Sequence, residues 1–371
     1  MYGRTNLIPL LFSTILAANG CAPHSNIVKD RTENTALLGY EDANGRQIPV
    51  TTKAGWELKR LQILNNMQKG MGNLPDMNNL PDFDLHYTDS IREYNYIRYG
   101  INFRIADNER ITAFLYIPDR LNSTTQSPAM LALHETDPLG KESVDGRSVN
   151  LNLAYGKELA QRGYFVLAPD YPGFGGMKDY DFETDRYQSG TMKGIFAHMR
   201  SVDLLCSILN VDPDRIGVIG HSLGGHNSIF VGAFDLRLKV IVSSCGWTGF
   251  DYYDIGAEAR QKYGGRLGPW ALPKYMPLLR EKYDLDPQRI PFDFDEIIAA
   301  IAPRVFISIS PVHDENFNVS GVKKQIENVS KVYKFLGVPE NLKVYYPDAK
   351  HDFPFEIRIK TYEMINKALS H

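Results

Sequence analysis

The sequence is poor in cysteine and has little excess charge of either sign. It contains only 3 Cys among 371 residues, and no Cys/His spacing typical of a zinc site. The formal net charge is -3, which gives no electrostatic case for binding nucleic acid or a membrane surface. The Gly-x-Gly-x-x-Gly spacing of nucleotide-binding loops is also absent. We therefore expect no metal and no organic cofactor.

Long hydrophobic runs are missing too, and the one at the amino terminus is too short to span a bilayer. Residues 7–18 are apolar and follow a short, positively charged start, and the small residues Ala18 and Gly20 precede Cys21. This pattern resembles a bacterial lipoprotein signal, although such signals usually carry leucine where Ala18 stands. We expect residues 1–20 to be a signal peptide and Cys21 to be lipidated, which places the protein in the bacterial periplasm or cell envelope. Plain secretion with cleavage at the same bond is the alternative.

The rest of the chain predicts a tether followed by one domain. Residues 21–50 are polar and without a pattern, as in a tether, and residues 51–371 are long enough for a single large domain. An amphipathic helix at 56–71 belongs to an N-terminal extension over 51–90. Cys206 and Cys245 are expected to be buried free thiols.

The period of the hydrophobic pattern changes along this domain. Residues 94–103 and 110–117 alternate as in a β-hairpin, whereas later strands are wholly apolar and alternate with helices. This order indicates an α/β class: a mostly parallel central sheet with helices on both faces and an antiparallel start. An aromatic-rich insertion at 246–302 interrupts the alternation, and such insertions overhang the carboxyl ends of the strands, where ligands bind.

The most informative motif is Gly220-His221-Ser222-Leu223-Gly224, which fits the pattern Gly-x-Ser-x-Gly. It follows a short apolar strand and precedes a segment that can continue as a helix. Strand, tight turn and helix are the context of a nucleophile elbow, in which the serine hydroxyl stands clear of the sheet. We assign Ser222 as the nucleophile.

A serine nucleophile needs a histidine base and an acid that orients it. In the order typical of the elbow, the acid follows a later strand and the histidine follows the last strand. Asp314 and His351 occupy these two places. Glu315 is the alternative acid, and Asp348 is a weaker one.

The oxyanion donors are expected at two backbone N–H groups. One belongs to Leu223, directly after the nucleophile, and the other to Thr136, in the loop after the strand at 129–133. In this loop Glu135 stands where a glycine is common, which suggests a substrate contact, and His134 is expected to brace the loop. Tyr171 and Trp247 are further candidates for substrate binding, because they lie in segments predicted to form pocket walls.

At these residues the chain resembles the dienelactone hydrolase and acetyl xylan esterase-like branch of the α/β-hydrolase superfamily, from about residue 94 to residue 369. The resemblance implies the α/β-hydrolase fold and carboxylic-ester hydrolysis without a metal or cofactor. Exported members often deacylate polysaccharides, and some similar proteins are methylesterases. Dienelactone hydrolases themselves use a cysteine nucleophile, from which Ser222 departs.

The sequence thus predicts a serine esterase that acts on acyl or methyl esters of a carbohydrate. Two other functions stay open. A prolyl-oligopeptidase-like peptidase shares the core, but no propeller fits into the residues before Tyr94. A non-catalytic glycan-binding protein on the same scaffold would be expected to have lost a triad member. The acyl group, the alcohol and the oligomeric state are not encoded in any motif.

Overall fold

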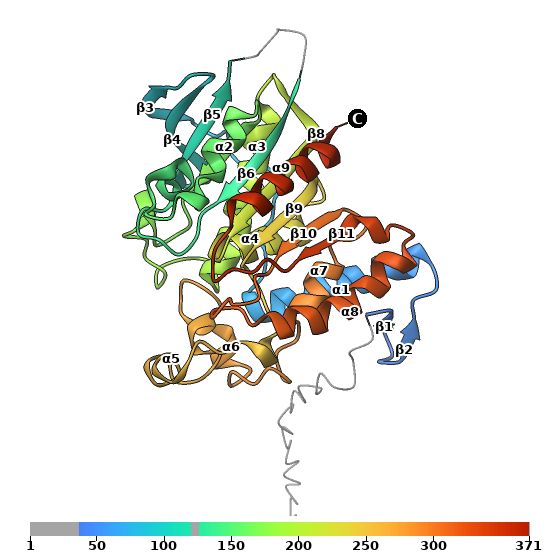
Figure 1. Ribbon diagram of the computed structural model, residues 1–371. Helices are drawn as coiled ribbons and strands as arrows, with labels where there is room; N and C mark the ends of the chain where they lie inside the picture. The colour runs from blue at the N-terminus through green and yellow to red at the C-terminus, as the bar shows by residue number, and fades with distance from the viewer. Residues whose placement is uncertain (1–36, 120–125, 371) are drawn as a thin grey trace, which may run out of the picture.

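The structure is a computed structural model that describes residues 37–119 and 126–370. A large central sheet is covered by helices, and a small two-stranded sheet lies near the beginning of the described chain (Figure 1). The expected signal at 1–20 and the expected lipidation site Cys21 lie outside the described residues. Within those residues, no helix is both long enough and apolar enough to cross a membrane.

Nine strands build the central sheet. They are β3 (His86–Arg92), β4 (Tyr96–Ala106), β5 (Glu109–Pro118), β6 (Ser127–Leu133), β7 (Phe165–Pro169), β8 (Val211–His221), β9 (Leu238–Ser244), β10 (Val305–Ile309) and β11 (Leu342–Tyr345). Their order across the sheet is β11-β10-β9-β8-β6-β7-β5-β4-β3. In this sheet β3 pairs with β4, β4 with β5 and β5 with β7 in antiparallel fashion, and all the other pairs are parallel. The predicted antiparallel start of a mostly parallel sheet is confirmed.

Helices cover both faces of this sheet, except for α5 and α6, which lie at one end of the molecule. The described helices are α1 (Lys53–Met71), α2 (Tyr155–Gln161), α3 (Gly190–Ser207), α4 (Leu223–Phe234), α5 (Ala257–Tyr263), α6 (Leu278–Glu281), α7 (Phe294–Ala299), α8 (Val319–Phe335) and α9 (Phe355–Leu369). Buried side chains of α1, α3, α4, α7 and α8 share one hydrophobic cluster, and those of α2 and α9 share another. Successive strand residues feed opposite clusters: Val218 of β8 joins the first and Ile219 joins the second.

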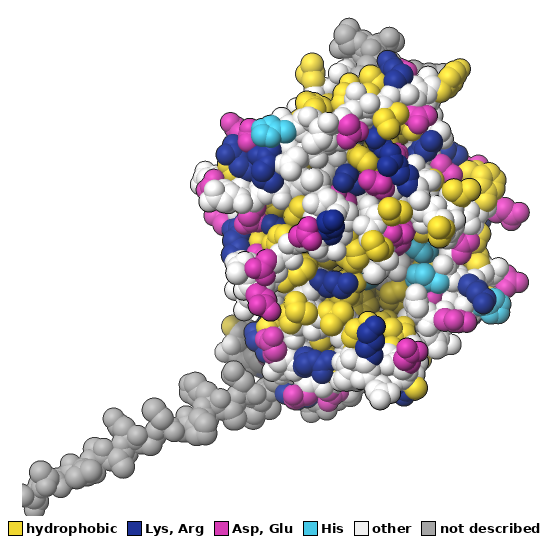
Figure 2. Space-filling view, turned by 90° about the vertical axis from the view of Figure 1, so that its left-hand side faces the viewer, with side chains coloured by type: hydrophobic (Ala, Val, Ile, Leu, Met, Phe, Trp, Pro, Cys, Tyr) yellow, Lys and Arg dark blue, Asp and Glu magenta, His cyan; other side chains and the backbone are white. Residues whose placement is uncertain are grey.

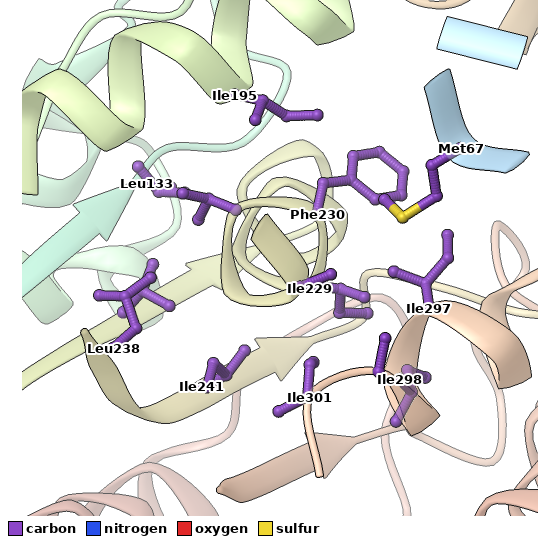
Figure 3. Close-up of a cluster of buried hydrophobic side chains, with 14 of the residues drawn as sticks. Met67, Leu133, Ile195, Ile229, Phe230, Leu238, Ile241, Ile297, Ile298 and Ile301 are labelled. Atoms are coloured by element: carbon purple, nitrogen blue, oxygen red, sulfur yellow. The ribbon is translucent and has the colours of Figure 1, made fainter. Parts of the chain in front are cut away.

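Helix α4, which begins directly after Ser222, lies at the centre of the larger cluster. Ile229 and Phe230 of α4 are fully buried, and Figure 3 shows them between Ile195 of α3, Met67 of α1 and Ile297 of α7. Such close packing on all sides leaves the helix little freedom to move. The serine turn is therefore attached to one of the most deeply buried elements of the fold.

The expected tether over 21–50 is only partly correct. Its last residues form a hairpin of β1 (Gly39–Glu41) and β2 (Gln47–Pro49). The Asp42 carboxylate accepts hydrogen bonds from the backbone N–H groups of Asn44 and Arg46, and Gly45 supplies the positive φ that the turn requires. Leu37 and Val50 at the two ends are buried in the core. The segment is ordered because these two apolar residues anchor it.

The insertion between β9 and β10 carries α5, α6 and α7 and several short helical turns. Figure 1 shows α5 and α6 together at one end of the molecule, away from the body of the sheet. The insertion begins and ends in the main hydrophobic core, which contains Trp247 and Phe250 from its start and α7 from its end. The middle of the insertion is therefore held at both ends and borders the carboxyl ends of the strands.

Candidate active site

The predicted nucleophile lies in a tight turn between β8 and α4. Ser222 has φ 53° and ψ -115°, a backbone conformation that L-residues other than glycine rarely adopt. The two glycines of the motif allow the close packing around it. A Cβ on Gly220 would lie 2.2 Å from Gly224, and a Cβ on Gly224 would lie 1.9 Å from the Leu133 carbonyl oxygen. The turn therefore has the geometry of a nucleophile elbow, pressed against the end of β6.

His351 and Asp314 form a hydrogen-bonded pair. The Nδ1 atom of His351 lies 3.0 Å from each carboxylate oxygen of Asp314. Backbone N–H groups of Asn316 and Phe317 donate to Oδ1 of the same carboxylate, whose side chain is only 1% exposed. A buried carboxylate held from several sides fixes the imidazole in one orientation.

The alternative acids lie elsewhere. Glu315 is exposed, and Asp348 forms a surface pair with His313 at 2.8 Å. The structure thus gives His351 one carboxylate partner, Asp314, among the acids considered from the sequence. The His351 ring also lies beside the elbow, with its centroid 4.9 Å from that of His221, the residue before Ser222. Burial lowers the pKa of His221 to about 3, so this neighbour is neutral at pH 7.

The loop after β6 is braced by His134, as expected. Its Nδ1 lies 2.6 Å from the Glu135 carbonyl oxygen, and its Nε2 accepts a hydrogen bond from the backbone N–H of Tyr171. Burial lowers the pKa of His134, which keeps the ring neutral and Nε2 able to accept. The loop places Thr136 at the same cavity as Ser222 and Leu223. Both expected oxyanion residues therefore border the nucleophile.

Glu135 has an unusual environment for an acid. Its Oε2 accepts a hydrogen bond from the Ser143 hydroxyl at 2.9 Å, while Oε1 is buried and has no partner in the described part of the chain. Burial raises the pKa of Glu135 to about 7, against the opposing effects of hydrogen bonds from its own backbone and from Ser143. Glu135 does not line the cavity. The charge of His351 also acts on its carboxyl group, so the two side chains are near each other.

A cavity of about 300 Å³ opens at Ser222. Thr136 and Leu223 line it near the serine, and Phe317 lines it from the loop that carries Asp314. Most of the other lining residues belong to the insertion, among them Tyr253, Trp270 and Tyr275. Figure 2 shows a hollow lined by hydrophobic side chains, with Lys or Arg and His side chains around it. The site thus combines a reactive serine with an aromatic wall of a kind that packs against sugar or aryl rings.

Two of the expected substrate-binding aromatics do not line this cavity. Trp247 is 1% exposed, packs against Phe294 and donates from its indole N–H to the Ser308 hydroxyl at 2.9 Å. Tyr171 is buried against Leu223, and its hydroxyl donates to the Lys274 carbonyl. We therefore correct that expectation. Trp247 is a residue of the hydrophobic core, because both its ring and its N–H group have partners there. Tyr171 packs beneath the cavity wall and contacts it through the Lys274 carbonyl.

Sequence reasoning missed Trp270 and His226 as lining residues. Both residues line the cavity, and their ring centroids are 4.8 Å apart. The aromatic composition of 246–302 identified the right segment. It could not identify the right residue, because the middle of the insertion has no period that separates inward from outward side chains.

Nitrogen and sulfur atoms that could hold a metal gather beside the pair. One donor atom from each of His221, Cys245 and His351 lies within 4.8 Å of the others. The Cys245 thiol, however, donates to the Asp352 carbonyl, and burial raises its pKa well above the usual value. Nδ1 of His351 is taken by Asp314. We therefore interpret these side chains as neighbours that pack around His351, and not as a metal site. Cys206 and Cys245 are free thiols.

Comparisons with known proteins agree with this geometry. A family described as "Glucuronyl esterase, fungi" matches residues 182–337, which include Ser222 and Asp314. The putative hydrolase YtaP of Bacillus subtilis (strain 168) is 26% identical over 306 residues, which are 80% of this chain and 94% of that protein.

Solved structures with the same architecture include esterases. A glucuronoyl esterase from Solibacter usitatus matches with a TM-score of 0.68 and 18% identity, covering 91% of this chain and 97% of that one. A putative acetyl xylan esterase from Bacteroides fragilis matches with a TM-score of 0.62 and 17% identity, covering 90% and 99%. The nucleophile elbow, the sheet order and these structural similarities together show the α/β-hydrolase fold.

Proposed function

We propose that the protein is a serine hydrolase that cleaves carboxylic esters of a carbohydrate. The observation that carries this proposal is the His351–Asp314 pair, which lies beside the strained elbow of Ser222. A half-buried imidazole that is oriented by a buried carboxylate and lies beside a serine turn is the arrangement that makes a hydroxyl nucleophilic at neutral pH.

The proposed reaction follows from these positions. His351 takes the proton of the Ser222 hydroxyl as the oxygen attacks the ester carbonyl, and the backbone N–H groups of Leu223 and Thr136 stabilise the oxyanion. The same proton passes from His351 to the leaving alcohol, which leaves an acyl-enzyme. Water then repeats the sequence and releases the acid. Asp314 stays ionised and keeps the imidazole oriented.

A carbohydrate is the favoured substrate for two reasons. The cavity wall consists largely of aromatic rings such as Trp270 and Tyr253, whose centroids are 5.5 Å apart, and flat rings of this kind pack well against sugars. In addition, similar proteins of known structure carry the names glucuronoyl esterase and acetyl xylan esterase. In a glucuronoyl ester the sugar supplies the acid part of the ester, whereas in acetyl xylan the sugar supplies the alcohol part. Acetyl and uronoyl esters are therefore both candidates.

A labelling and hydrolysis experiment tests the proposal. The wild-type protein should react covalently with a fluorophosphonate probe and should release acetate from acetylated xylan or methanol from methyl-esterified pectin or methyl glucuronate. Ser222→Ala should abolish both the labelling and the release. Equal labelling of Ser222→Ala, or cleavage of aminoacyl-proline amides in preference to every ester, would overturn the assignment.

We further propose that the enzyme is exported and anchored through a lipid on Cys21. The sequence supports this with the apolar run at 7–18 and the small residues before Cys21. Polymeric carbohydrates are met outside the cytoplasm, so export fits the proposed substrate. Wild-type protein should incorporate labelled palmitate and sediment with membranes, whereas Cys21→Ser should do neither. Palmitate-free protein in the soluble periplasmic fraction would indicate plain secretion.

A further inference from the structure

The side chains that line the cavity at Ser222 carry a positive charge that no lining carboxylate balances. Among the described residues that line it, none is Asp or Glu, and Lys274 is the one with a permanent positive charge. The lining His226 is neutral, because burial lowers its pKa to about 3. A partly enclosed, aromatic cavity with one uncompensated cation attracts an anionic ligand.

The backbone around Lys274 is held in place. The backbone N–H of Thr191 at the start of α3 donates to the Tyr275 carbonyl at 3.0 Å, and the Tyr171 hydroxyl donates to the Lys274 carbonyl at 2.8 Å. The approach is so close that a Cβ on Gly190 would lie 2.4 Å from the Lys274 carbonyl oxygen. The lysine therefore starts from a fixed point in the wall, and only its side chain is free to adjust.

The ammonium group lies against aromatic rings and has no acid partner. Its Nζ is 4.8 Å from the centre of the Phe174 ring and 5.4 Å from that of Tyr275. Ring faces hold a cation in place without neutralising its charge. In the part of the chain that the structure describes, no carboxylate forms an ion pair with it. Its charge is thus left for a ligand.

This charge is close to the reacting centre. Tyr275 lines the same cavity as Thr136, one of the two proposed oxyanion residues. Lys274 is the neighbour of Tyr275 in the chain and lines the same cavity as Ser222. A substrate whose ester carbonyl lies at Ser222 and Thr136 would bring its adjoining sugar ring toward Lys274.

We infer that the enzyme acts on esters of acidic carbohydrates, and that Lys274 binds an anionic oxygen group of the sugar, a carboxylate or a sulfate, next to the ester that is cleaved. This inference rests on the proposed esterase function and adds a specificity-determining residue to it. The anionic group is separate from the ester carbonyl and stays unchanged in the reaction.

Matched substrates test the inference. The positional monoacetates of methyl glucoside, of methyl glucuronoside with its free carboxylate, and of methyl glucoside 6-sulfate share one ring and differ only at C6. Wild-type enzyme should show a kcat/KM at least roughly tenfold higher for a carboxylate or sulfate ester than for the neutral ester, as expected for one charge-assisted hydrogen bond. The preferred anion identifies the natural group, and the preference should shrink as the salt concentration rises.

Substitution of Lys274 supplies the comparison. In Lys274→Met the ratio of kcat/KM for anionic over neutral ester should fall to about one, while Lys282→Met, which removes an exposed lysine of the same insertion, should keep the wild-type ratio. Calorimetry with Ser222→Ala adds a readout that needs no turnover: methyl glucuronoside, which has a free carboxylate, or glucose 6-sulfate should bind, and more weakly once Lys274→Met is added.

The outcomes separate the two proposals. Hydrolysis of all three esters with equal kcat/KM would overturn the role of Lys274 and leave the esterase function intact. A ratio unchanged by Lys274→Met would also overturn it. Hydrolysis of none of the esters, together with failure of the fluorophosphonate labelling, would reject the esterase function itself, and absence of anion binding by Ser222→Ala would then reject the subsite as well.

Discussion

The backbone at Ser222 is held in a conformation that serine rarely adopts, and its neighbours make this possible. A φ of 53° with ψ of -115° costs on the order of 1–3 kcal/mol. The buried α4 and the contact of Gly224 with the Leu133 carbonyl hold the turn in place. In return, the Ser222 hydroxyl and the Leu223 N–H are fixed relative to the loop that carries Thr136. Little reorganisation is then needed when the oxyanion forms.

Asp314 and its exposed neighbour Glu315 form a natural pair of test positions. Asp314→Asn should lower kcat by roughly 10³–10⁴-fold, because an amide at this position favours the wrong imidazole tautomer and cannot stabilise the charged ring. Glu315→Gln should change kcat less than about twofold. Steady-state kinetics on a p-nitrophenyl ester would check both. A large loss in Glu315→Gln with little loss in Asp314→Asn would contradict the assignment of the acid.

Glu135 should make stability depend on pH. Its folded-state pKa of about 7 lies above the ordinary value of 4.5, so the folded protein retains a proton that the unfolded chain releases. Wild-type stability should therefore decline as the pH rises from about 4.5 to 7. Relative to wild type, Glu135→Gln should gain roughly 2–3 kcal/mol between pH 5 and pH 8.

Urea denaturation at both pH values would measure this gain. The exposed Glu363→Gln serves as the control and should track wild type at each pH. Using the difference between two pH values removes any constant effect of the substitution on packing. A Glu135→Gln curve parallel to that of wild type would show that Glu135 is ionised in the folded protein.

Among the helices, α4 depends on partners at both ends. Its first turn carries the elbow, and its last turn is capped from a distance by Arg304, which donates to the carbonyls of Gly232, Asp235 and Leu238 at 2.6–3.0 Å. Burial lowers the pKa of Arg304 to about 10, so the guanidinium remains charged at pH 7. A cation at this end also interacts favourably with the helix dipole.

Replacing this cap should destabilise the fold. Arg304→Met would leave four carbonyl groups, those of Gly232, Asp235, Leu238 and Ile301, with fewer partners and should lower the free energy of unfolding by about 2 kcal/mol. Arg304→Lys should recover only part of the loss, because one ammonium cannot reach all the carbonyls that the planar guanidinium reaches. Urea midpoints with an unchanged m-value would measure both. A loss below about 0.5 kcal/mol in Arg304→Met would show that water replaces the cap.

The elements that the sequence could predict are those buried on both sides. Strand β6, expected at 129–133, was located within two residues of its observed bounds, because a buried parallel strand is a continuous apolar run. β3 was missed because all its residues are exposed and it pairs only at the sheet edge with β4. The hairpin β1–β2 was missed although Asn44-Gly45 is a hairpin signal, because its strands have only three residues each.

The order of the described strands explains why the sequence could place the three candidate catalytic residues near one another, whereas it could not define the pocket wall. Ser222, Asp314 and His351 follow strands whose carboxyl ends meet at one edge of a parallel sheet, so strand order alone brings their loops together. The cavity wall comes from an insertion whose path depends on contacts with distant elements, such as that of Tyr275 with α3. Composition revealed that this segment was aromatic, and only the tertiary structure distinguished Trp270 from Trp247.

A connection between distant segments holds the residue that follows His351 in the chain. Asp352, directly after His351, accepts hydrogen bonds from the side chains of Asn150 and Asn152 at 2.9 and 2.7 Å, across about 200 residues of sequence. Arg358 of α9 extends this contact by donating to the Asn152 side-chain oxygen at 2.9 Å. None of these four residues lines the cavity. We therefore expect the two asparagines to position His351, the proposed base, through Asp352.

Removing both asparagines should slow the reaction without weakening substrate binding. In Asn150→Ala/Asn152→Ala the loop after β11 gains freedom, so His351 spends less time aligned with Ser222, and kcat should fall about tenfold while KM stays within about twofold. Asn78→Ala, which removes an exposed Asn–Asp hydrogen bond elsewhere, is the matched control and should keep both constants. A lower melting temperature with unchanged kcat would mean that the connection stabilises only the fold, because a merely structural contact would not change the rate of the correctly folded enzyme.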